Sequence, residues 1–378
     1  MKILIVMAGF FPGKKYGGPP VSIDNFCSLL SGHHCCIITS NHDLGEDKAY
    51  EGVGEGWLDR GNCRICYLGD RDYRKKTFEE KIKEIKPDII YLQGLFQSCV
   101  VPCLQLAKKY NVRVLLAPRG ELCAGALNLK KYKKIPYMET VRLLGLTKGI
   151  HWQSTSDEET EAIIRWMKAD SRKIHRLENI PSIPKRPYAR KEKIAGEGKF
   201  VFLSRIHPKK NLLAAIQLFD GISGHAVFDI YGPIEDAVYW ESCRREADKL
   251  GKNASVRYKG LVSHDQVHDV FSQYDAFVFP TLSENFGHVI AESMFVGTTV
   301  IISDQTPWND VNDAGVGWAI DLRDEQSFRN AVQTIIDEDE ISARERSNRT
   351  IRYITDKMNI AETRDSYGKV LREIRESR

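Results

Sequence analysis

The sequence lacks any apolar stretch long enough to cross a membrane. A membrane-spanning helix needs about 20 consecutive apolar residues, and no window of the 378-residue chain approaches that length. The chain begins MKILIVMAGFFPG, which has one lysine and a short apolar run but no small-residue cleavage site after it. We therefore expect this segment to be a buried first strand rather than a secretory leader.

Paired cysteine spacings are also missing, although the chain has nine cysteines. Its one CxxC string, Cys63 to Cys66, has no second pair with which to complete a zinc site. Disulfide frameworks belong to oxidising compartments. The cysteine pattern therefore favours a reduced, cytoplasmic protein.

Metal-binding patterns are scarce. His264 and His268 have the i, i+4 spacing of two ligands on one helix face, but the string lacks the glutamate of H-E-x-x-H. We expect these two histidines to form a solvated helix face. Two Asp-x-Asp strings, at 70–72 and 337–339, lie in strongly charged segments, and such short strings arise often by chance. The sequence predicts no metal site.

No G-x-G-x-x-G string follows either of the first strands expected in the two halves of the chain, which disfavours a nicotinamide dehydrogenase. What the chain does have is a repeated alternation of apolar strand runs and helical patterns. That alternation is typical of an α/β fold with parallel sheets, and the length indicates two domains. Residues 178–199 have three prolines and no periodicity, as expected of a linker.

Charge is divided unevenly along the chain. Residues 1–195 carry a net charge of +11 and residues 196–378 a net charge of −7. Opposite charges on the two halves predict domains with different partners. The positively charged first half is expected to bind an acidic surface or substrate.

Residues 277–303 form the most informative stretch. An apolar strand ends near Pro280, a polar loop follows, a helix is expected from about Phe286 to Phe295, and a β-branched strand closes the unit. Glu284 lies in the loop and Glu292 on the helix. First-turn amides have no partner inside a helix and form an anion site. Two acceptors beside such a site suit a sugar nucleotide, although two glutamates alone are also compatible with an ordinary βαβ unit whose carboxylates are solvated.

The string P-T-x-S-E-N-F-G-x-V-I-A-E-S-x-x-x-G resembles the E-x7-E motif of the retaining glycosyltransferases of family 4. The T-P-W string at 306–308 resembles one subgroup of that family. The resemblance implies the GT-B architecture, in which two Rossmann-like domains face each other across a cleft and a C-terminal helix crosses back to the first. The corresponding boundaries are an acceptor domain at 1–185, a nucleotide-sugar domain at 186–355 and the tail at 356–378.

The resemblance also implies roles for individual residues. Glu284 would hold sugar hydroxyls and Glu292 the ribose diol. Arg205 and Lys210, after the first strand of the second domain, would contact the diphosphate. The remaining donor-binding positions are Gly17, Gly18, Gly260, Asn285, Phe286, Gly287, His288 and Val289.

The chain departs from the family where a histidine often lines the reaction centre. Arg119 stands there, in LLAPRGEL, and Gln93 replaces a second common histidine. Arginine cannot act as a base but can bind a phosphate or an anionic acceptor. Glu121 is the nearest substitute for a general base, and a catalytic role for either residue is an expectation.

The sequence therefore predicts a retaining hexosyltransferase that needs no cofactor and no metal. Its donor would be a nucleoside-diphosphate sugar, with UDP favoured over GDP, and its acceptor a glycan or lipid-linked sugar in bacterial-type surface polysaccharide synthesis. Two alternatives stay open: a GT-B sugar-nucleotide epimerase and a non-catalytic sugar-nucleotide sensor. Residues 126–148 interleave lysines with tyrosine, leucine and isoleucine, as expected of contact with an anionic membrane. The protein would then be cytoplasmic and peripheral on the inner face of the membrane, with no nucleic-acid partner.

Overall fold

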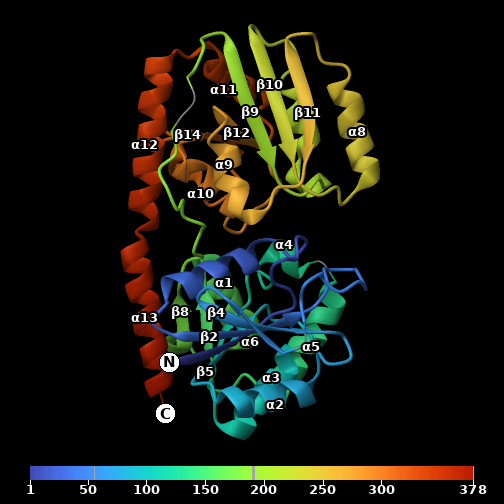
Figure 1. Cartoon of the computed structure of the whole chain (residues 1–378), viewed down its shortest axis with the longest axis vertical. Helices are drawn as coiled ribbons and strands as arrows, with labels where there is room; N and C mark the ends of the chain where they lie inside the picture. The colour runs from blue at the N-terminus through green and yellow to red at the C-terminus, as the bar shows by residue number, and fades with distance from the viewer. Residues whose placement is uncertain (55, 129, 190–191, 378) are drawn as a thin grey trace. The chain divides into compact units, whose positions relative to one another are not determined.

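The computed structural model describes residues 1–54, 56–128, 130–189 and 192–377, which divide into two compact units. Unit 1 comprises Met1–Ile180 and Ile360–Arg378, and unit 2 comprises Pro181–Asn359. Figure 1 shows that each unit has its own sheet with helices around it. Compared with the sequence-based division at 185/186 and 355/356, both boundaries are shifted by a few residues.

Unit 1 is built on an eight-stranded sheet with the order β3-β4-β2-β1-β5-β6-β7-β8. All neighbouring strands run parallel except β3 and β4, which are antiparallel, and the sequence analysis did not foresee β3. The strands are β1 (Lys2–Val6), β2 (His34–Ser40), β3 (Trp57–Arg60), β4 (Cys63–Leu68), β5 (Ile89–Gln93), β6 (Arg113–Ala117), β7 (His151–Ser154) and β8 (Ile174–Arg176).

Two apolar cores cover the two faces of this sheet. Along β1, Leu4 and Val6 enter one core while Ile3 and Ile5 enter the other, as the two-residue period of a strand requires. The first core takes residues from α2, α3, α5 and α6, and the second from α1 and α13. The helices are α1 (Gly18–Leu29), α2 (Lys75–Ile85), α3 (Val100–Tyr110), α4 (Ala124–Leu127), α5 (Lys131–Leu143), α6 (Asp157–Met167) and α13 (Ile360–Glu376).

The C-terminal helix belongs to unit 1 although it follows unit 2 in the chain. Tyr367, Leu371 and Ile374 of α13 are buried in the second of these cores. The expected return of the tail to the first domain is therefore confirmed (Figure 1).

Unit 2 is built on a six-stranded parallel sheet with the order β11-β10-β9-β12-β13-β14. Its strands are β9 (Glu197–Leu203), β10 (His225–Tyr231), β11 (Ala254–Gly260), β12 (Ala276–Phe279), β13 (Thr299–Ser303) and β14 (Gly317–Ile320). Its helices are α7 (Leu212–Gln217), α8 (Ala237–Ala247), α9 (Val267–Phe271), α10 (His288–Phe295), α11 (Glu325–Asp337) and α12 (Glu340–Met358).

The strand order gives each sheet one point at which the direction of winding reverses. In unit 1 this point lies between β1 and β5, and in unit 2 between β9 and β12. Ligands of open α/β sheets bind outside the carboxyl ends of the strands at such a point. The loops that follow these four strands are therefore where the fold favours a binding site.

The helices of the described ranges include none that is both long enough and apolar enough to cross a lipid bilayer. The longest, α12, has 19 residues and is strongly polar.

Candidate functional site

Two loops meet at the switch point of unit 2. One follows β9 and runs through residues 204–211, and the other follows β12 and runs through residues 280–287. The Leu282 amide donates to the Lys209 carbonyl at 2.9 Å, and the Thr281 hydroxyl reaches the same oxygen at 3.2 Å. These bonds join the loop of the E-x7-E motif to the loop of the basic residues.

Lys210 and Glu284 form an ion pair where the two loops meet. The Lys210 Nζ donates to Glu284 Oε1, and the Lys210 side chain is 9% exposed. Burial lowers the pKa of Lys210, and the nearby carboxylate of Glu284 opposes that shift. A buried ammonium held by a single carboxylate still has N–H groups to offer, so the pair is suited to receive a ligand that has both hydroxyls and negative charge.

Arg205 stands beside this pair and is held separately. Its Nη1 donates to both carboxylate oxygens of Glu235 at 3.1 Å. The positive charge of Arg205 contributes to the lowered pKa of Lys210, which indicates that the two cations share one neighbourhood. Two cations at the end of a parallel strand form an arrangement that binds a diphosphate.

The helix start at which we expect an anion site lies two residues later than the sequence suggested. Gly287 has φ 74° and caps the helix, and the helix itself starts at His288. That conformation favours glycine, and an added Cβ would lie 2.8 Å from the Ile290 side chain. His288 and Val289 are therefore first-turn residues, whereas Phe286 is outside the helix. The expectation that Phe286 opens the helix is wrong.

Trp308, from the T-P-W string, explains where α10 begins. It is 2% exposed, and its Nε1 donates to the Phe286 carbonyl at 2.5 Å. The two rings also pack edge to face with centroids 5.5 Å apart. Lys357, in the last turn of α12, lies 5.1 Å above the indole ring. The side chain of Trp308 therefore holds the turn that precedes the first amides of α10.

Glu292 has a different environment from Glu284. It is 3% exposed on α10, and its Oε1 has no hydrogen-bond partner among the residues that the structure describes. Burial raises the pKa of Glu292 to about 8. A buried polar atom without a partner destabilises a fold, so an unpaired carboxyl beside the site is consistent with an acceptor for a ligand's hydroxyls.

The other donor-site residues expected in unit 2 lie at the carboxyl ends of its strands or in the loops that follow them. Gly260 ends β11 with φ 84°, and its carbonyl accepts from the Gly232 amide at 2.9 Å. At Gly232 a Cβ would lie 1.9 Å from the Ser204 carbonyl, so the loops after β9, β10 and β11 are packed together. Asn285 is exposed in the loop that carries Glu284.

In unit 1, Gly17 and Gly18 occupy the turn between β1 and α1. Gly17 has φ 71° and caps α1, and Gly18 is the first residue of the helix. No described atom lies within 4 Å of a Cβ built on Gly17, so the backbone there is open to a ligand. The turn follows β1, at the switch point of this sheet.

Arg119 is tied into unit 1 by three protein acceptors. Its Nε donates to Gln93 Oε1 at 2.7 Å, its Nη1 to Asn179 Oδ1 and its Nη2 to the Tyr91 hydroxyl at 3.3 Å. Arg119 itself has φ 56°. These contacts fix the guanidinium and leave only its remaining N–H groups for an anion.

Glu121 holds the loop after β5. Its carboxylate accepts from the amides of Leu95 at 2.5 Å and Phe96 at 3.2 Å, and from Gln97 Nε2 at 3.3 Å. Burial raises the pKa of Glu121, and the two amide bonds oppose that effect. The carboxylate is therefore already committed to the backbone, which makes it a poor candidate for a general base.

The sequence analysis missed the residues that support Arg119. Asn179 belongs to the stretch expected to be a linker, yet it is 5% exposed and accepts from Arg119. The Tyr91 hydroxyl donates to Gln153 Oε1, and Gln153 Nε2 donates to the Tyr367 hydroxyl of α13 at 2.9 Å. The only sequence signal was the N-I-P turn at 179–181, which resembles a hinge motif and gives no hint of this contact.

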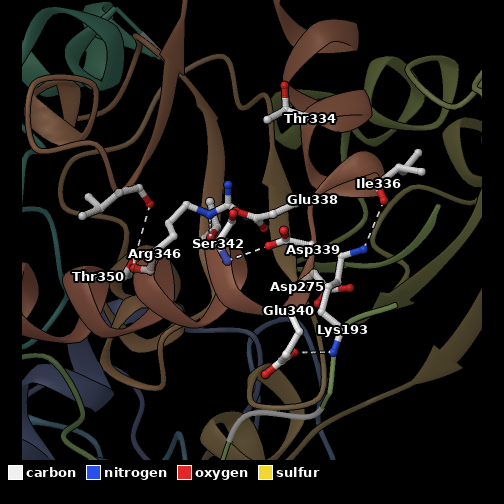
Figure 2. Close-up of polar contacts among 12 residues, drawn as sticks. Lys193, Asp275, Thr334, Ile336, Glu338, Asp339, Glu340, Ser342, Arg346 and Thr350 are labelled. Carbon is white, nitrogen blue, oxygen red and sulfur yellow. Dashed lines mark hydrogen bonds and ion pairs between the residues drawn. The ribbon is translucent and has the colours of Figure 1, made fainter. Parts of the chain in front are cut away.

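Both Asp-x-Asp strings have structural uses. Asp70 lies 2.9 Å from the His42 ring. Figure 2 shows Asp339 directed at Ser342, whose amide it accepts at 2.8 Å to cap α12, and Glu338 beside Arg346, with which it forms a buried ion pair. Across the ranges that the structure covers, no group of three or more His, Cys, Asp or Glu side chains is arranged to hold a metal.

His268 does not lie on a solvated face. It is 6% exposed on α9, and burial lowers its pKa to about 4. Its ring lies 6.2 Å from that of Tyr188. The expectation of a solvated pair is therefore wrong for His268, whose ring is buried and lies beside that of Tyr188.

Comparisons with known proteins give a family match for part of the chain and a fold match for nearly all of it. Residues 185–355 match the family model of glycosyl transferases group 1. The chain is 26% identical over 137 residues to the O-antigen chain mannosyltransferase B of Escherichia coli, and the match spans 34% of this chain and 35% of that relative. The chain therefore aligns with about a third of the length of the curated relative.

Solved structures that share the fold over nearly the whole chain include the following two. Sucrose-phosphate synthase from Thermosynechococcus elongatus superposes with a TM-score of 0.72 at 16% identity, covering 99% of this chain and 98% of that one. Anabaena HepE in complex with UDP and glucose superposes with a TM-score of 0.66 at 12% identity, covering 99% of this chain and 100% of that one. The fold is thus GT-B, and the match to the family model lies within unit 2.

Proposed function

We propose that this chain, with its glycosyl transferases group 1 domain at residues 185–355, is a retaining glycosyltransferase that moves a hexose from a nucleoside-diphosphate sugar to an acceptor hydroxyl. The observation that carries the proposal is the group formed by Lys210, Glu284 and the start of α10 at the switch point of unit 2. The placement of this group after β9 and β12 matches the position where open α/β sheets bind their ligands.

The roles follow from the charges of these groups. The diphosphate would be held by Lys210, Arg205 and the first-turn amides at His288 and Val289, because these are the positive groups of the site. Glu284 accepts from Lys210 in the free protein and would accept from hydroxyls of the sugar. Glu292, which has an unpaired buried oxygen, would accept from the ribose diol.

Retention of configuration would result from attack on the face from which the phosphate leaves. The acceptor oxygen bonds to the anomeric carbon while the bond from that carbon to the phosphate oxygen breaks. The acceptor's proton passes to an oxygen of the leaving diphosphate, so no side-chain base is required. This route suits the chain because Glu121, which the sequence offers in place of the family's histidine, is occupied by the amides of Leu95 and Phe96. Catalysis then rests on charge stabilisation of the leaving group.

Unit 1 would bind the acceptor, and its turn at Gly17 and Gly18 leaves backbone open to a ligand at the switch point of its own sheet. A glycan or lipid-linked acceptor in surface polysaccharide synthesis is consistent with the O-antigen role printed for the Escherichia coli relative. The nucleotide base and the sugar of the donor are left for one experiment to identify. The candidates come from HepE, which is in complex with UDP and glucose, and from the relative, which is named a mannosyltransferase.

The test measures transfer from UDP-glucose and from GDP-mannose to a panel of acceptor sugars, in EDTA and in Mn²⁺. We expect release of nucleoside diphosphate that depends on the acceptor, a product with the donor's anomeric configuration, and activity that survives EDTA. Conversion of the donor without an acceptor would favour an epimerase. Binding of the donor without turnover would favour a sensor. Complete loss in EDTA with rescue by Mn²⁺ would contradict the proposed handling of phosphate charge.

We further propose contact between residues 126–148 and an anionic membrane. Three large apolar side chains of this segment are exposed, namely Tyr132 at 73%, Leu143 at 88% and Leu144 at 56%. Tyr132 and Leu143 are 11 residues apart on α5, which places them on one face of the helix. Tyr137 is excluded from that surface because its hydroxyl donates to the Leu95 carbonyl at 2.9 Å.

The membrane proposal predicts flotation with vesicles that contain anionic lipid at low salt. Leu143→Ser with Leu144→Ser should abolish it, since both side chains are exposed and the fold does not depend on them. Val238→Ser, at a residue of α8 that is 80% exposed, is the matched control. Flotation that the double variant leaves unchanged, or that high salt does not weaken, would contradict membrane contact through this segment.

A further inference from the structure

A cavity of about 600 Å³ lies in unit 1, at the edge of the sheet where the parallel strands begin. Its walls come from the end of α2, the start of β5, the end of α3, the start of β6 and the last turn of α13. The lining residues are Ile82, Lys83, Lys86, Pro87, Asp88, Tyr110, Asn111, Val112, Arg113 and Arg375. The volume is within the range of small-molecule sites. None of these residues belongs to the group assigned to donor binding, and the turn at Gly17 follows the opposite end of β1.

Positive charge dominates the lining. Four of the lining side chains are cationic, and Asp88 is the one carboxylate among them. Asp88 is already engaged, because its Oδ2 accepts from the Lys2 amide at 2.8 Å and its Oδ1 lies 3.6 Å from Arg375 Nε. Asp88 therefore does not neutralise the positive charges of Lys83, Lys86 and Arg113.

Neighbouring carboxylates do little to neutralise these cations. Lys83 lies 3.7 Å from Glu79, but Lys109 takes the same oxygen at 2.6 Å and the Tyr110 hydroxyl also donates to it. Lys86 is exposed at the end of α2, where it occupies the left-handed conformation. A charge that is shared or solvated in this way is available to a ligand.

Arg113 is the most specific feature of the cavity. Its Nε is buried and has no hydrogen-bond partner within the described part of the chain. Its Nη1 makes one long contact, 3.5 Å from Asn111 Oδ1. A guanidinium binds the oxygens of a phosphate in pairs, so a phosphate in the cavity would supply the acceptor that Nε lacks.

We propose that this cavity binds a soluble phosphate monoester that carries a flat or apolar body. Arg113 and Lys86 would hold the phosphate, and Lys83 would add charge. The body would lie against Ile82, Val112 and Tyr110, which give the cavity an apolar wall. A phosphate dianion fits three cations better than a carboxylate, which brings one negative charge. The ligand would also contact the C-terminal helix through Arg375.

Phenyl phosphate is the probe, because it has the group and the body that the cavity requires and nothing more. Calorimetric titration of the full chain should show one site per chain, measured in a saturating concentration of the nucleoside diphosphate that the transfer assay identifies, so that the donor site is occupied. Arg113→Gln should weaken binding about tenfold to a hundredfold, the value of a lost charge-assisted bond. Lys86→Gln should weaken it less, and it removes an exposed side chain whose loss cannot unfold the protein. Lys76→Gln, an exposed residue of the same helix, should change nothing.

Vesicles of phosphatidylcholine with phosphatidic acid are the second probe, since they present the same group at a membrane surface. Binding of phenyl phosphate that depends on both Arg113 and Lys86 supports the proposal. Binding of the vesicles without binding of phenyl phosphate overturns the assignment of a soluble ligand. Failure of the wild-type protein to bind phenyl phosphate also overturns it. So does equal binding of phenyl phosphate by the wild type and by the double variant with Arg113→Gln and Lys86→Gln.

Discussion

Lys210→Gln is expected to lower kcat for sugar transfer about a hundredfold to a thousandfold, the usual cost of one donor aimed at charge that develops in the transition state. Lys210 is buried, it is ion-paired to Glu284, and it lies in the loop after β9 at the switch point of the sheet. Its ammonium would face the diphosphate as the bond to the sugar breaks. Steady-state kinetics with the donor that the transfer assay identifies provide the measurement.

Two further variants make the Lys210 experiment decisive. Lys209→Gln removes the same charge from an exposed neighbour and should change kcat little. Lys210→Gln leaves the Glu284 carboxylate without its cation and could destabilise the fold. The double variant with Lys210→Gln and Glu284→Gln removes both charges, so it separates loss of stability from loss of function. The double variant should recover thermal stability and remain inactive. If Lys209→Gln is the more damaging single change, the assignment of Lys210 is wrong.

Glu292→Gln is expected to act in opposite directions on nucleotide binding and on stability. If Glu292 holds the ribose diol, removing the charged acceptor should weaken nucleoside diphosphate binding about tenfold to a hundredfold. The same change should stabilise the ligand-free protein at high pH, because wild type must then ionise a buried carboxyl whose Oε1 has no partner among the described residues. A purely structural glutamate would not produce this combination.

The pH dependence fixes the sign of the stability effect. The pKa of Glu292 is about 8 in the folded protein, above its ordinary value of 4.5. Below pH 4.5 the carboxyl is protonated in both states and adds no difference. As pH rises from 4.5 to 8, the unfolded state ionises first and wild type loses stability, up to about 3–5 kcal/mol above pH 8.

Urea unfolding of wild type and Glu292→Gln between pH 4 and pH 9 measures this difference. The curves should coincide near pH 4 and diverge as pH rises, with the variant more stable. Glu345→Gln, an exposed residue of α12, is the control and should follow wild type. Parallel curves across the whole range would show that the carboxyl is not buried as a neutral group.

The alternation of strand and helix patterns predicted the α/β class, because that class depends on local periodicity. The length indicated two domains, and the resemblance of the motif at 280–297 implied the GT-B organisation and the return of the last helix. Buried parallel strands such as Lys2–Val6 are continuous apolar runs, and such runs are visible without knowledge of the fold. The short strand at 57–60 was missed because it is antiparallel at the edge and only partly buried. Its pairing with β4 cannot be read from four residues.

Side-chain partnerships were harder to predict, because they depend on which strands are neighbours. His151 and His175 look isolated in the chain, but the pairing of β7 with β8 brings their rings into contact at 2.9 Å. Asn179 was assigned to a linker and instead supports Arg119. The start of α10 was misplaced because the Phe286 carbonyl is taken by Trp308, 22 residues away. No local pattern contains that information.

If Glu292 holds the ribose diol, nucleotide binding would release hydrogen ions. At pH 7 a carboxyl with a pKa of about 8 keeps its hydrogen ion in most free molecules, whereas a diol that donates two hydrogen bonds binds the ionised form more tightly, because both oxygens of a carboxylate are acceptors. Most donor molecules that bind would therefore displace a hydrogen ion into the solvent. Because only about a tenth of free molecules are ionised at pH 7, the apparent dissociation constant would be up to about tenfold larger there than at pH 9. The affinity of the protein for its donor would thus rise with pH, because of the carboxyl of Glu292 on α10.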